Sequence, residues 1–200
     1  LYQRVAASAV RSAARQWGEE AVLVGSSLGG LAALRAAQDD DLPARAVVAI
    51  GPAGFGVQPW VAALQRAAVA IGLAARAPVP HALSRALMGE AYARLCTRGG
   101  VDRETRERFC SHLTPGDLGR VLLLGRQVLA EVSQPGAVDV AEIAVPVSLI
   151  WGRHDALCPA SGAEIVLARR PDVVVHLRDD AGHCVHLDEA EAVAEIVAAL

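Results

Sequence analysis

The 200 residues suit one domain, or one domain with a small insert, and a hydrophobic content of 53% indicates that the chain buries a sizeable core. The formal net charge of −3 argues against nucleic acid or an anionic membrane surface as a partner. No uninterrupted apolar run of about 18 residues is present, so we expect no membrane span.

The first quarter of the chain predicts a βαβ unit. Gly18 is expected to end the first helix. The periodicity of apolar residues predicts a helix, a strand, a helix and a strand, in that order, over residues 2–17, 21–25, 28–37 and 46–50. The first strand is apolar throughout, which is typical of a central parallel strand covered on both faces. This order of elements favours a parallel sheet.

The alternation stops after the second strand and resumes near residue 147. Glycine and proline separate four predicted helical stretches, which cover residues 60–76, 81–96, 103–112 and 118–132. The resumed part predicts two strands and two helices, over residues 147–151, 173–177, 160–169 and 187–200. The chain is therefore expected to consist of a core formed by residues 1–56 and 138–200 and a helical cap formed by residues 57–137.

The first strand leads into a G-x-S-x-G pattern, Gly25-Ser26-Ser27-Leu28-Gly29. A strand that turns sharply into a helix holds its central serine, here Ser27, in a strained conformation at the end of the sheet. We expect Gly25 and Gly29 to keep Cβ atoms out of a place where the strand and helix backbones nearly touch. The N-terminal end of the following helix suits developing negative charge.

A serine hydroxyl needs a base, and that base needs an orienting group. Asp155 and His183 each follow a later predicted strand, and the carboxyl ends of parallel strands share one edge of a sheet. Ser27, Asp155 and His183 are therefore predicted to meet there. We favour His183 over His186 because it lies in a loop beside Gly182, whereas His186 is expected to begin the closing helix.

Other carboxylates fit the orienting role less well. Asp179 and Asp180 lie too near His183 on the same loop, and Asp139 precedes its strand and so lies at the wrong edge. His154 has no spaced carboxylate or cysteine partner, so we expect neither a metal nor a cofactor.

These blocks resemble the α/β-hydrolase fold superfamily in its capped serine hydrolase branch. Three segments carry the resemblance, in the family's order: Gly25-Ser26-Ser27-Leu28-Gly29-Gly30, Trp151-Gly152-Arg153-His154-Asp155 with Pro159, and Gly182-His183 followed by Asp188-Glu189. The resemblance implies that Ser27 attacks an acyl carbonyl, His183 transfers its proton and Asp155 orients the histidine. It also implies that the backbone N–H of Leu28 supplies one oxyanion donor and that water releases the acyl group.

The resemblance also implies strands that this sequence lacks. The family has about eight strands and a His-Gly-type loop that supplies the second oxyanion N–H, whereas one helix precedes residue 21 here. We therefore expect the chain to be the carboxyl-terminal part of a longer hydrolase, with about four strands present. The strand at 21–25, although central in composition, would then be an edge strand.

The leading functional hypothesis is a cytoplasmic hydrolase of a small-molecule carboxylic ester or similar acyl substrate. Ser26, Phe55 and Trp60 are the candidate substrate-binding residues. One alternative is a C–C bond hydrolase of ring-fission diketones, because segment 51–56 resembles a Gly-Pro-Gly-Gly-like stretch of those enzymes. This resemblance implies carboxylate-binding candidates in the cap: Arg66, Arg76, Arg85 and Arg94. The others are acyl transfer or perhydrolysis on the same residues, and an inactive fragment or non-catalytic partner chain. The sequence leaves the oligomeric state open.

The cysteines show no C-x-x-C spacing. Free thiols in a reducing compartment are therefore expected of all of them: Cys96, Cys110, Cys158 and Cys184. Because Cys158 and Cys184 lie close to Asp155 and His183 in the sequence, the two could be neighbours in space. The sequence supports neither a disulfide nor a reactive thiol there.

Overall fold

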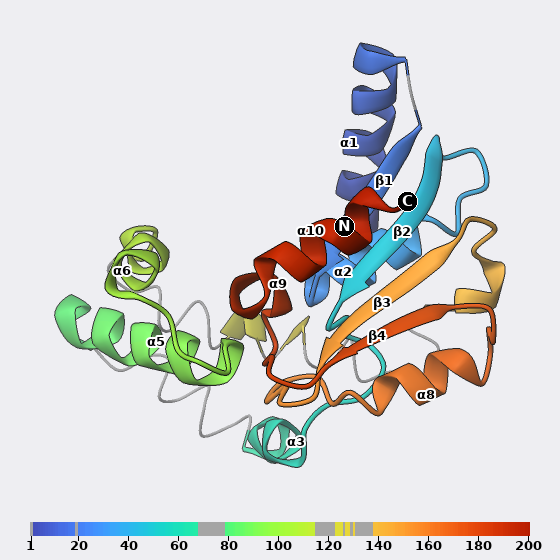
Figure 1. Cartoon of the computed structure of the whole chain (residues 1–200). Coiled ribbons are helices and arrows are strands. Elements are labelled where there is room, and N and C mark those ends of the chain that lie inside the picture. Colours follow the sequence, from blue (N-terminus) through green and yellow to red (C-terminus); the bar gives the residue numbers. More distant parts are fainter. Residues whose placement is uncertain are drawn as a thin grey trace.

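A single parallel sheet forms the centre of the molecule (Figure 1). The computed structural model describes residues 2–18, 20–67, 79–114, 123–125, 127–128, 130 and 138–200. Within this part, the sheet has four strands in the order β1-β2-β3-β4. Their bounds are Ala21–Ser26, Ala44–Ile50, Val147–Gly152 and Val174–Arg178. All neighbouring pairs are parallel, so the α/β class and the predicted strands are confirmed.

Alternate residues of the strands pack against two different layers of helices. On β2, Val47 and Ala49 belong to one core cluster, whereas Val48 and Ile50 belong to the other. The first face is covered by α1 (Tyr2–Trp17), α2 (Leu28–Ala36) and α8 (Gly162–Leu167). The second face is covered by α9 (Val185–Asp188) and α10 (Ala190–Ala198). Apolar side chains on both faces of β2 explain why its residues 46–50 form an unbroken apolar run.

Strand β1 lies at one end of the described sheet. Its Val24 is 49% exposed, although the strand is as apolar as a central one. The expectation of an edge strand is therefore met within the described residues. That further strands precede this part of the chain stays a prediction.

The closing helix differs from its prediction over residues 187–200. It begins two residues earlier, at Val185, and is broken at Glu189, where the backbone leaves the helical region (φ −138°, ψ 58°). The Glu189 carboxylate accepts a hydrogen bond from Arg178 Nε at 2.6 Å. This ion pair ties the break to the end of β4, which the apolar periodicity of the helix does not reveal.

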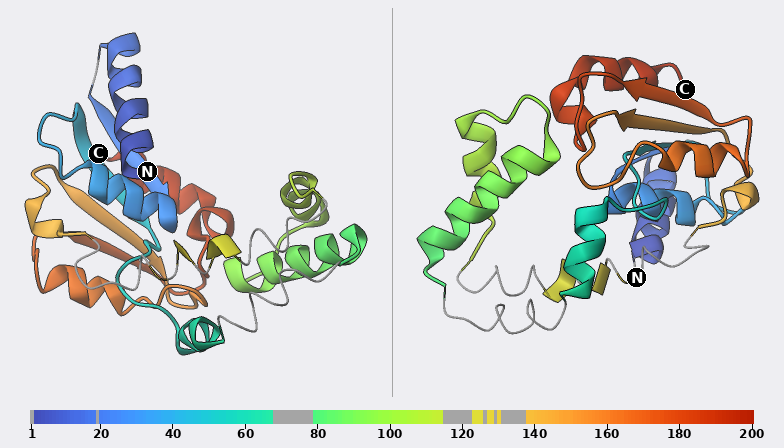
Figure 2. Two further views of the ribbon diagram at one scale, coloured as in Figure 1. Left: turned by 180° about the vertical axis from the view of Figure 1, so that it is seen from behind. Right: turned by 90° about the horizontal axis from the view of Figure 1, so that it is seen from below.

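Between β2 and β3 in the sequence, the α-helices whose bounds the structure gives are α3 (Pro59–Arg66), α5 (His81–Cys96) and α6 (Arg103–Ser111). They include two that stand clear of the sheet, α5 and α6 (Figure 2). The predicted helices at 81–96 and 103–112 are thus confirmed to within one residue. The second half of the predicted helix at 60–76, and most of that at 118–132, lie outside the described residues. The domain boundaries at 57 and 137 stay a prediction.

Two helix termini are capped in the usual ways. Gly18 takes a positive φ of 71° and donates its N–H to the Ala14 carbonyl at 2.8 Å, which ends α1 as predicted. Asp102 caps α6 by accepting a hydrogen bond from Thr105 N at 2.7 Å. None of the described helices is both long and apolar enough to cross a membrane.

Candidate active site

Ser27 occupies the turn between β1 and α2 with a strained backbone. Its φ of 55° and ψ of −118° make it the one non-glycine residue with a positive φ in the described part of the chain. Such a conformation costs about 1–3 kcal/mol, so the surrounding structure must hold it. Ser27 N–H donates to the Ile50 carbonyl (2.8 Å), and the Ser27 carbonyl accepts from Ala53 N–H (3.1 Å). The predicted strained serine turn is therefore confirmed.

Of the two glycines in the G-x-S-x-G pattern, only Gly25 stands where a side chain would not fit. A Cβ on Gly25 would lie 2.3 Å from the Gly29 carbonyl oxygen, whereas a Cβ on Gly29 would meet nothing within 4 Å. The expectation for Gly29 is thus wrong, because the missing side chain of this residue in the first turn of α2 points into open space. Gly30 is the second crowded position, since a Cβ there would lie 3.1 Å from the Gly25 carbonyl oxygen and 3.2 Å from Pro52 Cβ.

This difference predicts opposite effects of two neighbouring substitutions. Gly25→Ala is expected to lower the free energy of unfolding by about 3 kcal/mol, because its Cβ overlaps rigid backbone. Gly29→Ala is expected to raise it by about 0.5–1 kcal/mol, because alanine favours the helix over glycine. Urea denaturation of both variants measures these changes, and equal destabilisation by the two would contradict the prediction.

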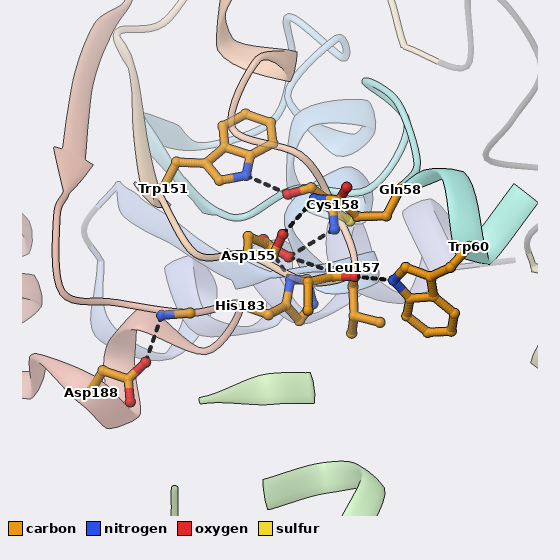
Figure 3. Close-up of polar contacts among 10 residues, drawn as sticks. Gln58, Trp60, Trp151, Asp155, Leu157, Cys158, His183 and Asp188 are labelled. Atoms are coloured by element: carbon orange, nitrogen blue, oxygen red, sulfur yellow. Dashed lines mark hydrogen bonds and ion pairs between the residues drawn. The ribbon is translucent and has the colours of Figure 1, made fainter. Parts of the chain in front are cut away.

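Asp155 and His183 form a buried pair at the ends of β3 and β4 (Figure 3). His183 Nδ1 lies 2.8 Å from Asp155 Oδ2, and each residue is 3% exposed. The other carboxylate oxygen, Oδ1, accepts hydrogen bonds from the N–H groups of Leu157 and Cys158, both at 2.8 Å. With Oδ1 fixed by two backbone donors, the carboxylate can accept the Nδ1–H of the histidine and leave Nε2 free.

The start of the cap braces the loop that carries the acid (Figure 3). Gln58 Nε2 donates to the Asp155 carbonyl at 2.7 Å, and Trp60 Nε1 donates to the Ala156 carbonyl at 2.8 Å. Both side chains thus hold backbone atoms of one loop. The structure therefore places Trp60, predicted to contact substrate, against the acid loop, with 41% of its surface exposed.

Two further glycines let the loops of the site approach one another. A Cβ on Gly51, whose φ is +47°, would lie 3.0 Å from Asp155 Oδ2 and 3.4 Å from His183 Nδ1. A Cβ on Gly152 would lie 2.1 Å from the Gly182 carbonyl oxygen. The backbone at the end of β2 thus packs closely against the Asp155–His183 pair, and the end of β3 packs directly on the histidine loop.

Ser27 and His183 open into the same cavity, which has a volume of about 520 Å³. It is lined almost wholly by apolar groups, and α5 and α6 form its far wall. Tyr92 and Phe109 stack across these two helices with ring centroids 4.1 Å apart. The other lining residues are Ser26, Met88, Ala91, Leu95, Cys96, Leu157 and Cys184.

The structure brings together most of the predicted site residues. Ser26, Ser27 and His183 line the cavity, Asp155 supports the histidine from behind, and Leu28 begins α2, where its N–H is one that a helix leaves free. Phe55 does not join them. It is 6% exposed and belongs to the main core cluster, where its Cβ lies 3.0 Å from the position that a Cβ on Gly162 would take.

His186, the rival of His183 in the sequence analysis, is not hydrogen-bonded to Asp155. His186 lies on α9, and its Nδ1 is buried without a hydrogen-bond partner among the described residues. Burial lowers the pKa of His186, and the nearby His183 adds to this. The structure therefore favours His183 as the partner of Asp155. No group of three or more His, Cys, Asp or Glu side chains in the described ranges could hold a metal ion.

Cys184 contacts a cysteine from a distant part of the sequence. Its backbone N–H donates to the carbonyl of Cys96, the last residue of α5, at 2.5 Å, and all the cysteines are free thiols. Cys158 is buried instead beside Asp155, and burial raises the pKa of its thiol to about 12. The proximity of Cys158 and Cys184 stays a prediction, and the contact of Cys184 with Cys96 joins the histidine loop to the end of α5.

Sequence reasoning missed the residues that join the cap to the histidine loop. The Asp188 carboxylate accepts hydrogen bonds from Gly182 N–H at 2.8 Å and from Arg98 N–H at 3.0 Å. It thereby anchors the histidine loop and the α5–α6 turn at one point. The sequence offered one signal for this anchor, the acidic Asp188 soon after His183. The place of Asp188 in the family pattern, however, gives no information about contacts with the cap.

Comparison with known proteins agrees with this fold. The model of the Alpha/beta hydrolase family matches residues 2–196. A pimeloyl-[acyl-carrier protein] methyl ester esterase from Aromatoleum aromaticum is 29% identical over 191 residues, which cover 90% of this chain and 73% of the relative.

Solved structures with low sequence identity have the same fold. An alpha/beta hydrolase fold protein from Burkholderia ambifaria superposes with a TM-score of 0.72 at 16% identity, covering 97% of this chain and 71% of the other. An esterase from Exiguobacterium antarcticum gives the same TM-score at 17% identity, covering 99% and 73%. With a family match that spans nearly its whole length, the chain belongs to the alpha/beta hydrolase family.

Proposed function

We propose that the chain is a serine-dependent hydrolase of carboxylic esters. The observation that carries the proposal is that Ser27 shares an apolar cavity with His183, which is bonded to the buried Asp155. The strained backbone of Ser27 gives a reason to regard this serine as more than a packed turn residue. The esterase name of the Aromatoleum relative supports the same class of reaction.

In this mechanism the Ser27 hydroxyl attacks the acyl carbonyl while His183 Nε2 takes its proton. The Asp155 carboxylate, which accepts the Nδ1–H, orients the ring and stabilises the imidazolium that forms. The C–O bond to the leaving alcohol then breaks, and the histidine returns the proton to the alcohol oxygen. Water, activated by the same histidine, releases the carboxylic acid from Ser27.

The tetrahedral intermediate carries a negative oxygen that needs donors. The first free N–H of α2, that of Leu28, follows the nucleophile directly and is the proposed donor. The positive end of the helix dipole adds to its effect. A donor of this kind is typically worth about 3–4 kcal/mol of barrier.

The lining of the cavity favours a substrate with an apolar acyl or alkyl group. Among the described lining residues there is no arginine, so a carboxylate placed there would lose water without gaining a cation. Arg94, one of the carboxylate-binding candidates of the C–C hydrolase alternative, instead forms an ion pair with Glu90 on the cap surface. The cavity thus supports a neutral ester more than an anionic diketone.

Two measurements test this function. A fluorophosphonate probe, whose phosphorus is attacked by an activated serine, is expected to label the folded chain on the peptide that contains Ser27. For hydrolysis, p-nitrophenyl hexanoate is expected to give at least a tenfold higher kcat/KM than mono-p-nitrophenyl adipate, because only the second buries a carboxylate.

The outcomes separate the alternatives. Folded protein that neither reacts with the probe nor hydrolyses the esters would contradict the proposal and favour a non-catalytic partner chain. Preference for the anionic adipate ester would contradict the apolar substrate class. Product analysis in the presence of an alcohol or peroxide would show whether acyl transfer or perhydrolysis competes with water.

A further inference from the structure

Two cysteines from distant parts of the sequence meet where the cap contacts the histidine loop. Cys96 ends α5, and Cys184 directly follows His183. Both are free cysteines that are partly exposed, and both line the cavity that contains Ser27, so a small solute can reach them.

The backbones of the two cysteines are close enough for a disulfide. Cys184 N–H donates to the Cys96 carbonyl at 2.5 Å. Standard bond lengths then hold the two Cα atoms no more than about 6.4 Å apart. Disulfides span Cα separations of about 4.4–6.8 Å, so the backbone separation lies within the range that a disulfide requires.

Neighbouring contacts hold this approach in place. A Cβ on Gly182 would lie 3.0 Å from both the carbonyl carbon of Thr97 and the nitrogen of Arg98. Asp188 bonds to the N–H groups of Gly182 and Arg98, one on each side of the contact. These backbone contacts therefore hold the two cysteines next to each other.

The two thiols are chemically unequal. The hydrogen bond from Cys184 lowers the pKa of the Cys96 thiol, and the nearby His183 acts in the same direction. The same contact, together with burial, raises the pKa of Cys184. Cys96 is thus the better attacking thiolate of the two, and Cys184 is the neighbouring thiol that can meet the oxidised sulfur.

We propose that Cys96 and Cys184 form a reversible disulfide, with a peroxide as oxidant, that links the cap to the histidine loop and switches hydrolysis off. The Cys96 thiolate attacks one peroxide oxygen, the O–O bond breaks, and a sulfenic acid and hydroxide form. Cys184 then attacks this sulfur, the S–O bond breaks, and the two released hydroxides leave as water with the two thiol protons. Two thiols and one hydrogen peroxide thus give one disulfide and two waters.

The loss of activity follows from the position of Cys184 in the chain. Sulfur atoms in a hydrogen bond must approach by more than about 1 Å to reach the disulfide length of about 2.05 Å. Because Cys184 adjoins His183, this movement displaces the proposed base, and a misplacement of about 1 Å can cost up to about 100-fold in rate. This consequence rests on the proposed function, whereas formation of the disulfide does not.

The test compares the purified full chain before and after treatment with equimolar hydrogen peroxide. Thiol titration in denaturant is expected to show a fall from four thiols to two, and peptide mapping to show Cys96 linked to Cys184. Closing so long a loop is expected to raise Tm by roughly 5–10 °C. Ester hydrolysis is expected to fall at least tenfold, and dithiothreitol is expected to reverse all these changes.

Variants assign the effect. Cys96→Ser and Cys184→Ser should each abolish the linked peptide, the rise in Tm and the difference between oxidised and reduced rates. Cys110→Ser, a buried control outside the cavity, should retain all three. A missing Cys96–Cys184 link, or a link to Cys158, would overturn the proposal whether or not the chain hydrolyses esters. A disulfide without loss of hydrolysis would overturn the switch.

Discussion

Replacing Ser27 with alanine is expected to lower kcat/KM for p-nitrophenyl hexanoate by about 10⁴–10⁶-fold. The substitution removes the atom that forms the acyl-enzyme and leaves only binding and oxyanion stabilisation to act on a water molecule. The residual rate is measured in end-point assays at high enzyme concentration. Ser26→Ala, which removes the adjacent hydroxyl from the same cavity, is the matched control, with an expected loss of less than tenfold.

Replacing Ser27 with glycine tests the backbone strain at this residue independently of the chemistry. Ser27→Gly should be as inactive as the alanine variant, yet it should raise the free energy of unfolding by about 1 kcal/mol, because glycine adopts a φ of 55° without steric cost. Full activity of Ser27→Ala, or a larger loss with Ser26→Ala, would assign the chemistry to a different group.

Asp155→Asn is expected to lower kcat by about 10⁴-fold with little change in KM. The two backbone donors of Leu157 and Cys158 will hold the amide oxygen, which turns the amide NH₂ toward His183. Nδ1 must then accept a hydrogen bond, so the proton moves to Nε2, and the ring loses the lone pair that takes the serine proton.

The matched control for this variant is Asp180→Asn, an exposed carboxylate on the histidine loop. It removes the same charge near the same histidine without touching the Nδ1 bond, and activity should remain within about twofold of the wild type. Steady-state kinetics of both variants give the comparison. Comparable losses in the two would mean that net charge, and not the tautomer of the histidine, sets the rate.

The sequence predicted the core because its signals are local. Apolar runs mark β1 to β4, and the meeting of Ser27, Asp155 and His183 at one edge follows from the carboxyl ends of parallel strands. The steric role of Gly25 was predicted correctly and that of Gly29 was not. Which glycine faces backbone depends on the direction of a missing Cβ, which a pattern of letters does not contain.

The cap shows the limit of the same reasoning. Helices α5 and α6 are recognisable from the sequence, but the side chains that they turn toward Ser27 depend on how the helices are docked. Phe55 and Trp60 were plausible substrate contacts because aromatic residues often line pockets. One is needed in the core and the other holds the acid loop, and both uses arise from tertiary contacts.

The shared anchor at Asp188 has a consequence for the recombination of relatives. Because this carboxylate binds both the α5–α6 turn and the histidine loop, a chimaera that exchanges the cap alone brings a foreign backbone to a native carboxylate. Any misfit there passes to the loop that carries His183. Grafting intended to alter substrate range should therefore transfer the α5–α6 turn and residues 182–188 as a single inherited unit.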